Sequence, residues 1–440
     1  MERYEKYKDS GIAWLGEIPE HWETKKLKYV GLFINGFSFN SKDFRKFGVK
    51  VLKISNIQNM TIDWSDSVFL DDDFYTTHSN FRVHKNDLVF ALTRPIISTG
   101  IKVAFVDTNE KILLNQRNAI FRTKSAEIKW IYFILLSQKF ISEFDKQIDK
   151  TGQQPNISSN EIGDISISIP PIKEQRTIAA FLDRKTAEID ELIAQKERLI
   201  ALYEEEKTAI INEAVTKGIN PDVKLKPTAI DWLGDIPEHW KQIPFRWCCY
   251  ITEGQVDPTN SQFRQLPLIA PNHIESKTGK LIQKETAEEQ GAISGKYFYK
   301  SGTLLYSKIR PALVKACIAD EDGLCSADMY PILTKNNLLP KFMLYQILSK
   351  GFTQLAILVS DRVAMPKLNR DTLGDFSILV PPLEEQKAIA EYIEKETARI
   401  DAKIAKTKRI IELQKEYRTA LISEAVTGKI KIPDLTEPKP

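Results

Sequence analysis

Cysteine and histidine are scarce in this sequence. Its 440 residues include four cysteines and five histidines, and the histidines are scattered along the chain. Cys248 and Cys249 are adjacent, whereas Cys317 and Cys325 are too far apart for a Cys-x-x-Cys pair. A disulfide framework would need more cysteines at this length, and a zinc site would need closer pairs with histidines nearby. We therefore expect neither.

Long apolar runs are also absent. The most apolar stretch, residues 128–141, is interrupted by two lysines, a serine and a glutamine, so it is not the uninterrupted segment that crosses a bilayer. Residues 1–10 are charged and lack the apolar core of a signal peptide. We expect a cytoplasmic protein with no membrane partner.

The sequence carries none of the common signatures of a catalytic or cofactor site. It has no G-x-G-x-x-G, G-x-S-x-G or (Asp/Asn)-Pro-Pro-aromatic motif, and Thr278-Gly279-Lys280 lacks the upstream glycine of a P-loop. The acidic clusters 71–73 and 320–322 lie in polar, turn-like surroundings and are expected to be solvated loops. We therefore expect no catalytic residue, no bound cofactor and no metal ion on this chain.

The overall charge says little about a partner. The chain has 62 Lys and Arg against 59 Asp and Glu, a net charge of +3. A nucleic-acid binder usually shows a strong basic surface, so any such surface here must be local or supplied partly by a partner. The length alone suggests roughly two to four domains.

The most informative feature is an internal duplication. Residues 11–22 read GIAWLGEIPEHW, and residues 229–240 read AIDWLGDIPEHW. A second pair of similar segments, 170–219 and 381–430, is identical at about half of its positions. The sequence between the matched segments diverges. A constant frame with variable inserts predicts two similar halves, related by an approximate twofold axis, whose inserts recognise different things.

The second pair of frame segments is predicted to form long helices. Residues 172–217 contain neither proline nor glycine, their copy is 383–427, and Gly218 and Gly428 mark the two ends. At ~1.5 Å per residue the first helix is ~70 Å long. Its apolar stripe needs a partner, and twofold symmetry makes the other copy an antiparallel one. Two core helices of one larger domain are the alternative, which the charged remainder of each turn disfavours.

The residues expected to pack in this helix pair, a coiled-coil spacer, share three- and four-residue spacing or its multiples. They are Ile178, Leu182, Ile189, Ile193, Ile200, Ile210, Ile389, Ile393, Ile400, Ile404, Ile411 and Leu421.

The two inserts are predicted to be similar α+β domains. Strands are expected at 50–54, 88–92, 101–106, 119–121 and 165–169 in the first insert, and at 268–270, 303–309, 315–319, 329–333 and 376–380 in the second. One amphipathic helix is expected in each, at 130–148 and 341–358. The predicted organisation is a frame segment 1–24, a domain 25–169, a helix segment 170–219, a linker with the repeated frame 220–240, a domain 241–380, a helix segment 381–432 and a tail 433–440.

Loops after these strands carry side chains able to hydrogen-bond to base edges. Arg pairs with guanine, and Asn or Gln with adenine, through two bonds each in the major groove. A single loop Asn is more often a turn former, but the equivalent placing of Arg94-Pro95 and Arg310-Pro311 favours a shared role. The DNA-binding candidates are Ser55, Asn56, Gln58, Asn59, Thr93, Arg94, Asn115, Gln116, Arg117, Asn272, His273, Lys308, Arg310 and Ser326.

With these motifs the chain resembles the specificity subunits of type I restriction–modification systems along nearly its whole length. The resemblance lies in the WLGEIPEHW opening, the segments 86–106 and 302–319, the PPIKEQ and PPLEEQ helix starts, and the Thr-Ala-Glu-Ile stretch at Thr186. Asn86 stands where the family often has Gly before Asp87, and Thr303 stands in the Asp position. Both are turn positions, so these departures cast little doubt on function.

The resemblance implies a non-catalytic, sequence-specific DNA-binding subunit. Each insert would be a target-recognition domain that reads one half of a bipartite, asymmetric DNA sequence, and the helix pair would set the unread spacer. Two modification subunits would bind the frame and helices, bring S-adenosylmethionine and methylate adenine. Two restriction subunits, where present, would bring ATP-dependent translocation and cleavage with Mg.

Two other functions stay open at the level of sequence. One is a stand-alone DNA methyltransferase, which the missing Asp/Asn-Pro-Pro-aromatic motif disfavours. The other is a scaffold that binds no DNA and whose helices join protein partners.

Overall fold

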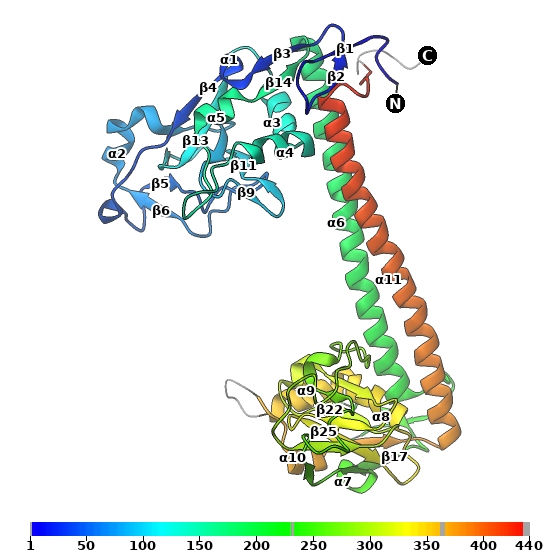
Figure 1. The fold of residues 1–440 in the computed structure, drawn as a ribbon. Helices are drawn as coiled ribbons and strands as arrows, with labels where there is room; N and C mark the ends of the chain where they lie inside the picture. The colour runs from blue at the N-terminus through cyan, green and yellow to red at the C-terminus, as the bar shows by residue number, and fades with distance from the viewer. Residues whose placement is uncertain (1, 229, 231–232, 361–365, 434–440) are drawn as a thin grey trace. The chain divides into compact units, whose positions relative to one another are not determined.

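A computed structural model describes residues 2–228, 230, 233–360 and 366–433 of the chain. Residues 229, 231 and 232 of the second frame segment, and residues 434–440 of the predicted tail, lie outside this description. The chain divides into two compact units: unit 1 comprises Met1–Gln195 and Ile410–Pro440, and unit 2 comprises Lys196–Arg409. Each unit therefore combines one insert with parts of both long helices (Figure 1).

The first long helix begins and ends where the sequence predicts, and the second ends one residue before its predicted end. Helix α6 spans Ile172–Lys217, and helix α11 spans Leu383–Val426. Proline precedes each helix. Its ring disfavours the helical conformation of the residue before it, so the helix does not begin earlier. Gly218 and Gly428 follow with φ of +80° and +68°, the left-handed conformation that commonly ends a helix.

The two helices lie side by side and run antiparallel within each unit (Figure 1). In unit 1 the Ser168 hydroxyl, just before α6, donates to the Val426 carbonyl at the end of α11, and Asp190 farther along α6 pairs with Arg418. In unit 2, Lys207 pairs with Asp401, and the ammonium of Lys403 lies 5.2 Å from the ring centre of Tyr203. Antiparallel pairing is therefore confirmed.

The predicted stripe residues are all at least half-buried. Ile178, Leu182, Ile189, Ile193, Ile389, Ile393, Ile400, Ile411 and Leu421 are buried, whereas Ile200, Ile210 and Ile404 are half-buried. Ile389 and Ile393 belong to the core of the second domain, so α11 uses part of its stripe to hold a domain as well as the other helix.

Unit 1 carries two four-stranded sheets, in the orders β11-β8-β13-β4 and β6-β5-β12-β7. Its strands are β1 (Tyr7–Asp9), β2 (Glu17–Pro19), β3 (Glu23–Lys26), β4 (Gly31–Asn35), β5 (Val49–Leu52), β6 (Val68–Leu70), β7 (Arg82–Val83), β8 (Leu88–Ala91), β9 (Ile96–Ile97), β10 (Gly100–Ile101), β11 (Val103–Phe105), β12 (Ile112–Leu114), β13 (Asn118–Thr123) and β14 (Ser166–Ile169). Its shorter helices are α1 (Leu27–Val30), α2 (Asp72–Thr77), α3 (Ile128–Leu136), α4 (Gln138–Lys146) and α5 (Ser159–Asp164).

Unit 2 repeats the plan with sheets β18-β25-β22-β23 and β19-β21-β24-β20. Its strands are β15 (Leu225–Lys226), β16 (Ile236–Pro237), β17 (Lys241–Pro244), β18 (Cys249–Ile251), β19 (Gln255–Val256), β20 (Leu268–Ile269), β21 (Lys296–Tyr299), β22 (Leu304–Ser307), β23 (Ala316–Ile318), β24 (Gly323–Cys325), β25 (Met329–Thr334) and β26 (Ser377–Val380). Its shorter helices are α7 (Phe245–Cys248), α8 (Pro340–Leu348), α9 (Lys350–Val359) and α10 (Arg370–Gly374). The predicted fold class, two similar α+β domains carried on paired long helices, is confirmed.

One detail of the predicted helices is wrong in both domains. The single helices expected at 130–148 and 341–358 are each broken in two. Ser137 and Ser349 sit at the breaks with extended backbone, and their hydroxyls accept the amides of Phe140 and Phe352 as N-caps of α4 and α9. A serine that bonds to the backbone starts a new helix at that point.

Among the described residues, no single helix is both long and apolar enough to cross a membrane. Helices α8 and α9 meet these criteria only when taken together across a bend of 68°.

The start of each long helix is attached to the frame by the same set of contacts. The Trp22 indole donates to Glu174 in the first turn of α6 (3.2 Å), and His21 contacts the same carboxylate (2.8 Å). In unit 2, Trp240 and His239 contact Glu385 in α11 at 3.0 and 2.8 Å. We call each set the Trp–Glu junction. A carboxylate at this position also suits the positive end of the helix dipole.

Trp240→Ala should lower the free energy of unfolding by about 3–5 kcal/mol, because it removes a buried indole and one donor to Glu385. Trp247→Ala is the matched control in the same unit, since Trp247 is 63% exposed; its effect should stay within about 0.5 kcal/mol. Urea unfolding followed by circular dichroism measures both changes, and equal values would contradict a structural role for the junction.

Candidate nucleic-acid interface

Six of the predicted contact residues of the first domain line one hollow of about 470 Å³. They are Ser55, Thr93, Arg94, Asn115, Gln116 and Arg117, and they are joined there by Lys53, Ile54, Lys102 and Gln154. A second hollow of about 570 Å³ shares Thr93, Arg117 and Gln154 with the first. We call the two together the basic hollow. No carboxylate lines either part of it.

The sheet brings these residues together from distant parts of the chain. Strands β5 and β12 are parallel, so their carboxyl ends lie at one edge. The Asn115 amide donates to the Leu52 carbonyl across this edge (3.1 Å), and the Leu92 amide donates to the Arg117 carbonyl (2.8 Å). Ser55 lies three residues after Leu52, and Arg94 and Arg117 each lie two residues after Leu92 and Asn115.

Three arginines are held in left-handed backbone conformation. The φ angles of Arg94, Arg117 and Arg310 are 46°, 60° and 48°. Residues with a side chain rarely adopt this conformation, and its cost of about 1–3 kcal/mol is borne where the surroundings impose it, often at functional sites.

The surroundings of Arg94 and Arg310 are equivalent in the two domains. The Arg94 amide donates to the Pro155 carbonyl, and the Arg310 amide donates to the Pro366 carbonyl, both at 2.8 Å. Both side chains are exposed. The backbone is therefore anchored in each domain while the guanidinium stays available.

Two cations of the basic hollow, Lys102 and Arg94, repel one another. The ammonium of the buried Lys102 donates to the Ile54 carbonyl, and burial together with the nearby charge of Arg94 lowers the pKa of Lys102. Because no acidic side chain lines the hollow, an anionic group placed there would relieve this repulsion.

The second domain gathers cations around an aromatic ring. The ammonium of Lys308 lies 5.5 Å from the centre of the Tyr330 ring, and the guanidinium of Arg370 lies 5.6 Å from the same ring. Burial, and then the charge of Lys367, lowers the pKa of Lys308. Arg370 also pairs with Glu253 at 3.0 Å, so its charge is partly balanced.

The structure places the remaining candidates differently. Asn56 and His273 are buried, each with an exposed fraction of 1%. Gln58 and Asn59 donate to the carbonyls of Ser55 and Ile101. Asn272 is exposed, and Ser326 is half-buried at the end of β24.

Asn56 and His273 have equivalent structural positions. The Asn56 side chain accepts the Lys53 amide and donates to the Asp63 carbonyl, each at 2.8 Å. The His273 ring accepts the Ala270 amide at 3.3 Å. Each side chain therefore shapes the loop after its strand and does not face solvent.

Sequence reasoning missed several residues of the interface. Gln153 and Gln154 line the basic hollow, and Lys367 and Arg370 lie beside Lys308. All four lie near the proline whose carbonyl accepts the arginine amide in each domain, Pro155 or Pro366. The occurrence of a proline at this place in both domains was the sequence signal that could have identified them. Residues 361–365, immediately before Pro366, lie outside the residues that the structure describes.

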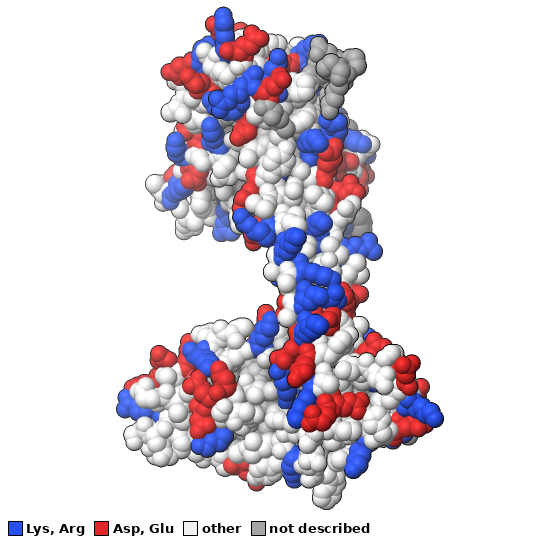
Figure 2. All heavy atoms as spheres, turned by 90° about the vertical axis from the view of Figure 1, so that its right-hand side faces the viewer, with Lys and Arg blue, Asp and Glu red and all other residues white. Residues whose placement is uncertain are grey.

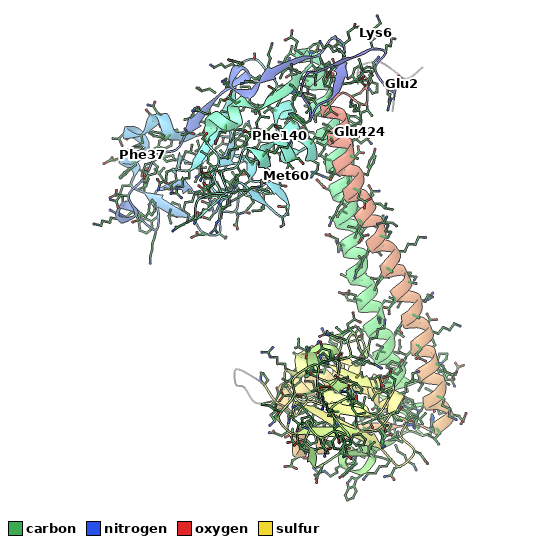
Figure 3. All side chains as sticks on the ribbon, in the orientation of Figure 1. Glu2, Lys6, Phe37, Met60, Phe140 and Glu424 are labelled. Carbon is green, nitrogen blue, oxygen red and sulfur yellow. The ribbon has the colours of Figure 1, made fainter. Side chains whose placement is uncertain are left out.

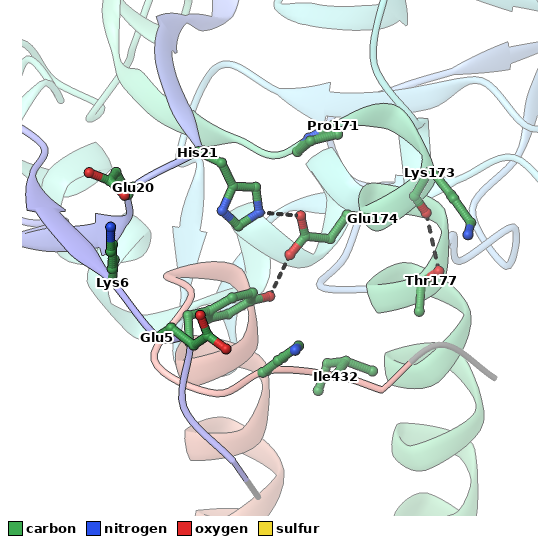
Figure 4. A pocket seen from close by; sticks show the side chains of 11 residues that line it. Glu5, Lys6, Glu20, His21, Pro171, Lys173, Glu174, Thr177 and Ile432 are labelled. Atoms are coloured by element: carbon green, nitrogen blue, oxygen red, sulfur yellow. Dashed lines mark hydrogen bonds and ion pairs between the residues drawn. The ribbon is translucent and has the colours of Figure 1, made fainter. Parts of the chain in front are cut away.

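A third hollow, of about 690 Å³, lies at the Trp–Glu junction of unit 1 (Figure 4). In it the Tyr4 hydroxyl donates to Glu174, and burial and this carboxylate raise the pKa of Tyr4. Figure 4 shows His21 beside Glu174, whose carboxylate also accepts the Tyr4 hydroxyl. The carboxylate is thus occupied by structural donors.

No three His, Cys, Asp or Glu side chains among the described residues are grouped so as to hold a metal ion. The four cysteines are buried and free. Two features could bind a ligand: the basic hollow, and the cluster of Lys308 and Arg370 around the Tyr330 ring. Both suit an anion that carries hydrogen-bonding groups.

Comparisons with a family model and with known proteins all match type I restriction–modification specificity proteins. The family model described as "Type I restriction modification DNA specificity domain" matches residues 19–201 and 259–414. The chain is similar to the EcoDI specificity subunit of Escherichia coli, with 29% identity over 303 residues, which cover 65% of this chain and 67% of the relative. It is also similar to the putative MjaX specificity subunit of Methanocaldococcus jannaschii, with 24% identity over 95% of this chain and 96% of the relative.

Two solved structures share the fold. A chain from the work "Structural basis underlying complex assembly and conformational transition of the type I R-M system" superposes with a TM-score of 0.69 at 17% identity, covering 94% of this chain and 99% of the other. The HsdS subunit of Thermoanaerobacter tengcongensis superposes with a TM-score of 0.56 at 18% identity, covering 94% and 98%.

Asn56→Ala should lower the free energy of unfolding by about 1–3 kcal/mol, because it leaves the Lys53 amide and the Asp63 carbonyl without their partner. Ser55→Ala, at the exposed neighbouring position, is the control and should change it by less than about 0.5 kcal/mol. Chemical denaturation measures both. If Asn56→Ala were as mild as the control, Asn56 would not shape this loop.

Proposed function

Because this chain belongs to the family of type I restriction–modification DNA specificity subunits, we propose that each of its two domains binds one half of a bipartite DNA target. The observation that carries the proposal is the basic hollow: arginine, lysine and amide side chains meet at one sheet edge, and no carboxylate lines it. Arginine and amide groups read base edges, and lysine neutralises phosphate.

We further infer that the chain recognises DNA and leaves catalysis to its partners. Two modification subunits would bind the frame and the helices and bring S-adenosylmethionine. Restriction subunits, where present, would bring ATP and Mg. A cytoplasmic location fits this role and stays a prediction.

The comparisons support neither of the alternative functions. The matched relatives are specificity subunits, not stand-alone methyltransferases, and the matched family model is a DNA specificity domain, not a protein scaffold.

The two long helices are suited to set the distance between the half-sites. Each is continuous through its whole length, and each contributes residues to both units. Figure 2 shows lysine and arginine side chains gathered over the helices, where the stretch 402–409 contains four basic residues and no acidic one. Such a surface favours a path for DNA phosphates near the helices.

Arg94→Ala should weaken binding of the cognate half-site by about 1–3 kcal/mol and relax specificity at one base, if the guanidinium pairs with a guanine. Arg184→Ala on α6 is the control, because Arg184 lies outside the basic hollow and near Glu188. The measurement is affinity for a set of half-site variants, made on the assembled complex. A uniform loss over all sequences would identify a phosphate contact instead, and no loss would remove Arg94 from the interface.

Inserting four residues after Gln195 and four after Arg409 tests the spacer role. These points lie at the division between the units, so the contacts within each unit are retained. Four residues make just over one helical turn and lengthen each helix by ~6 Å. The unread spacer should grow by one or two base pairs, at ~3.4 Å each, while the bases read in each half stay the same.

The methylated sequence recovered from cells that carry the modification subunits reports the spacer. Paired insertions of two residues are the control, because they rotate the apolar stripe by more than half a turn and should abolish methylation. An unchanged spacer after the four-residue insertions would show that the helices only hold subunits together.

A further inference from the structure

The sequence Thr-Ala-x-Ile-Asp occurs once in each long helix and ends in Asp190 and Asp401. Both carboxylates pair with a cation on the other helix. Asp190 receives two bonds from the Arg418 guanidinium, at 2.9 and 3.1 Å, and Asp401 receives the Lys207 ammonium at 2.6 Å. We call these the two cross-helix pairs. Only 15% of the Arg418 side chain and 17% of the Lys207 side chain are exposed.

A hairpin of each recognition domain reaches the cross-helix pair of its unit. In unit 1 the hairpin is closed by the bridge between Ile57 and Ile62, and the sulfur of Met60 lies 3.5 Å from the Arg418 guanidinium. Figure 3 shows Met60 on the side of the domain that faces the long helices.

The second unit repeats this contact with different side chains. Its hairpin is closed by the bridge between Ile274 and Leu281, and the Lys280 ammonium donates to Asp401 at 2.9 Å. The hairpin contact in unit 2 is therefore between an ammonium and a carboxylate, whereas the contact in unit 1 is between a thioether and a guanidinium.

The backbone of the two hairpins is anchored in the same way. Met60 and Lys277 have left-handed φ angles of 66° and 64°. Their amides donate to the carbonyls of Val103 and Val314, at 2.9 and 3.1 Å. Two domains whose sequences have otherwise diverged thus keep the geometry of this hairpin, which indicates a shared role.

Each hairpin continues directly from the segment that forms the candidate DNA interface. Ser55, which lines the basic hollow, lies two residues before Ile57, and Asn272 lies two residues before Ile274. A shift of the hairpin on the helices would therefore move the side chains presented to DNA.

We propose that Asp190, Arg418, Asp401 and Lys207 are positioning residues: through the two hairpins they hold each recognition domain at one angle on the helix pair and so restrict the enzyme to one spacer length. This inference rests on the proposed function. It adds that spacer selectivity depends on the hairpin contacts as well as on helix length.

Each domain has other attachments to the helices, so loss of the hairpin contact should loosen the domain without detaching it. In unit 1, Lys129 pairs with Asp183, and the Gln175 side chain accepts the Glu127 amide at 2.9 Å. In unit 2, the Gln386 side chain accepts the Leu339 amide at 2.8 Å.

The experiment uses the full chain produced with its modification subunits. The double variant Met60→Ala, Lys280→Ala removes both hairpin contacts and leaves both cross-helix pairs intact. Methylation is mapped on a library of sites in which the half-sites are constant and the spacer varies by one base pair at a time. The double variant should methylate neighbouring spacers about fivefold better relative to the cognate spacer, with unchanged half-site bases, since exposed or half-exposed contacts of this kind are worth up to about 1 kcal/mol.

A second set of variants tests the charges themselves. Asp190→Asn should broaden the accepted spacers in the same way, whereas Asp190→Glu, which keeps a carboxylate to pair with Arg418, should retain most of the selectivity. Lys185→Ala is the control, because the Lys185–Glu188 pair lies within α6 alone. It should leave the spacer profile unchanged.

The outcomes separate this inference from the proposed function. If the wild-type complex methylates no bipartite sequence, the proposed function fails. If it does, and the folded hairpin variant keeps a single spacer or loses methylation at all spacers alike, the positioning role is wrong. Circular dichroism of the purified chain establishes folding for each variant.

Discussion

The structure depends on the way each long helix starts. In each unit a buried tryptophan of the frame donates to a glutamate in the first helical turn, and the next frame strand, β3 or β17, pairs with the strand that leads into the helix. This closed arrangement fixes where a domain leaves the frame and where its helix begins. Because the same residues recur in both halves, two divergent domains are mounted in the same manner.

Much of this could be predicted from sequence, because periodicity and helix ends are local properties. Helix α6 spans the predicted residues, and each predicted strand overlaps an observed one. The broken helices at Ser137 and Ser349 were missed, because the apolar spacing continues across the break and only the hydroxyl cap interrupts it. Short strands such as β7 were missed because pairing with distant strands, not their own pattern, stabilises them.

The interface was predictable only in part, for a related reason. Arg94, Asn115 and Arg117 could be found because each follows a strand, but burial of Asn56 depends on carbonyls seven and ten residues away. Gln154 joins the hollow because the Arg94 amide bonds to Pro155 far along the chain. Side-chain type and loop position suggest which residues could contact a ligand. Long-range backbone hydrogen bonds determine which of these residues lie together at the surface.

A net charge of +3 is compatible with DNA recognition because a basic surface can be local. Among the described residues, no acidic side chain lines the basic hollow, where the buried Lys102 ammonium donates to a carbonyl and lies near the charge of Arg94. Weak overall attraction limits binding to arbitrary DNA, since nonspecific affinity follows the number of phosphates neutralised. The specific complex can then draw its affinity from base contacts made in both half-sites together. In the proposed function that requirement links the two domains: the base contacts of the basic hollow would be supplemented by those of the second domain, whose candidate residues include Lys308 and Arg370 beside Tyr330.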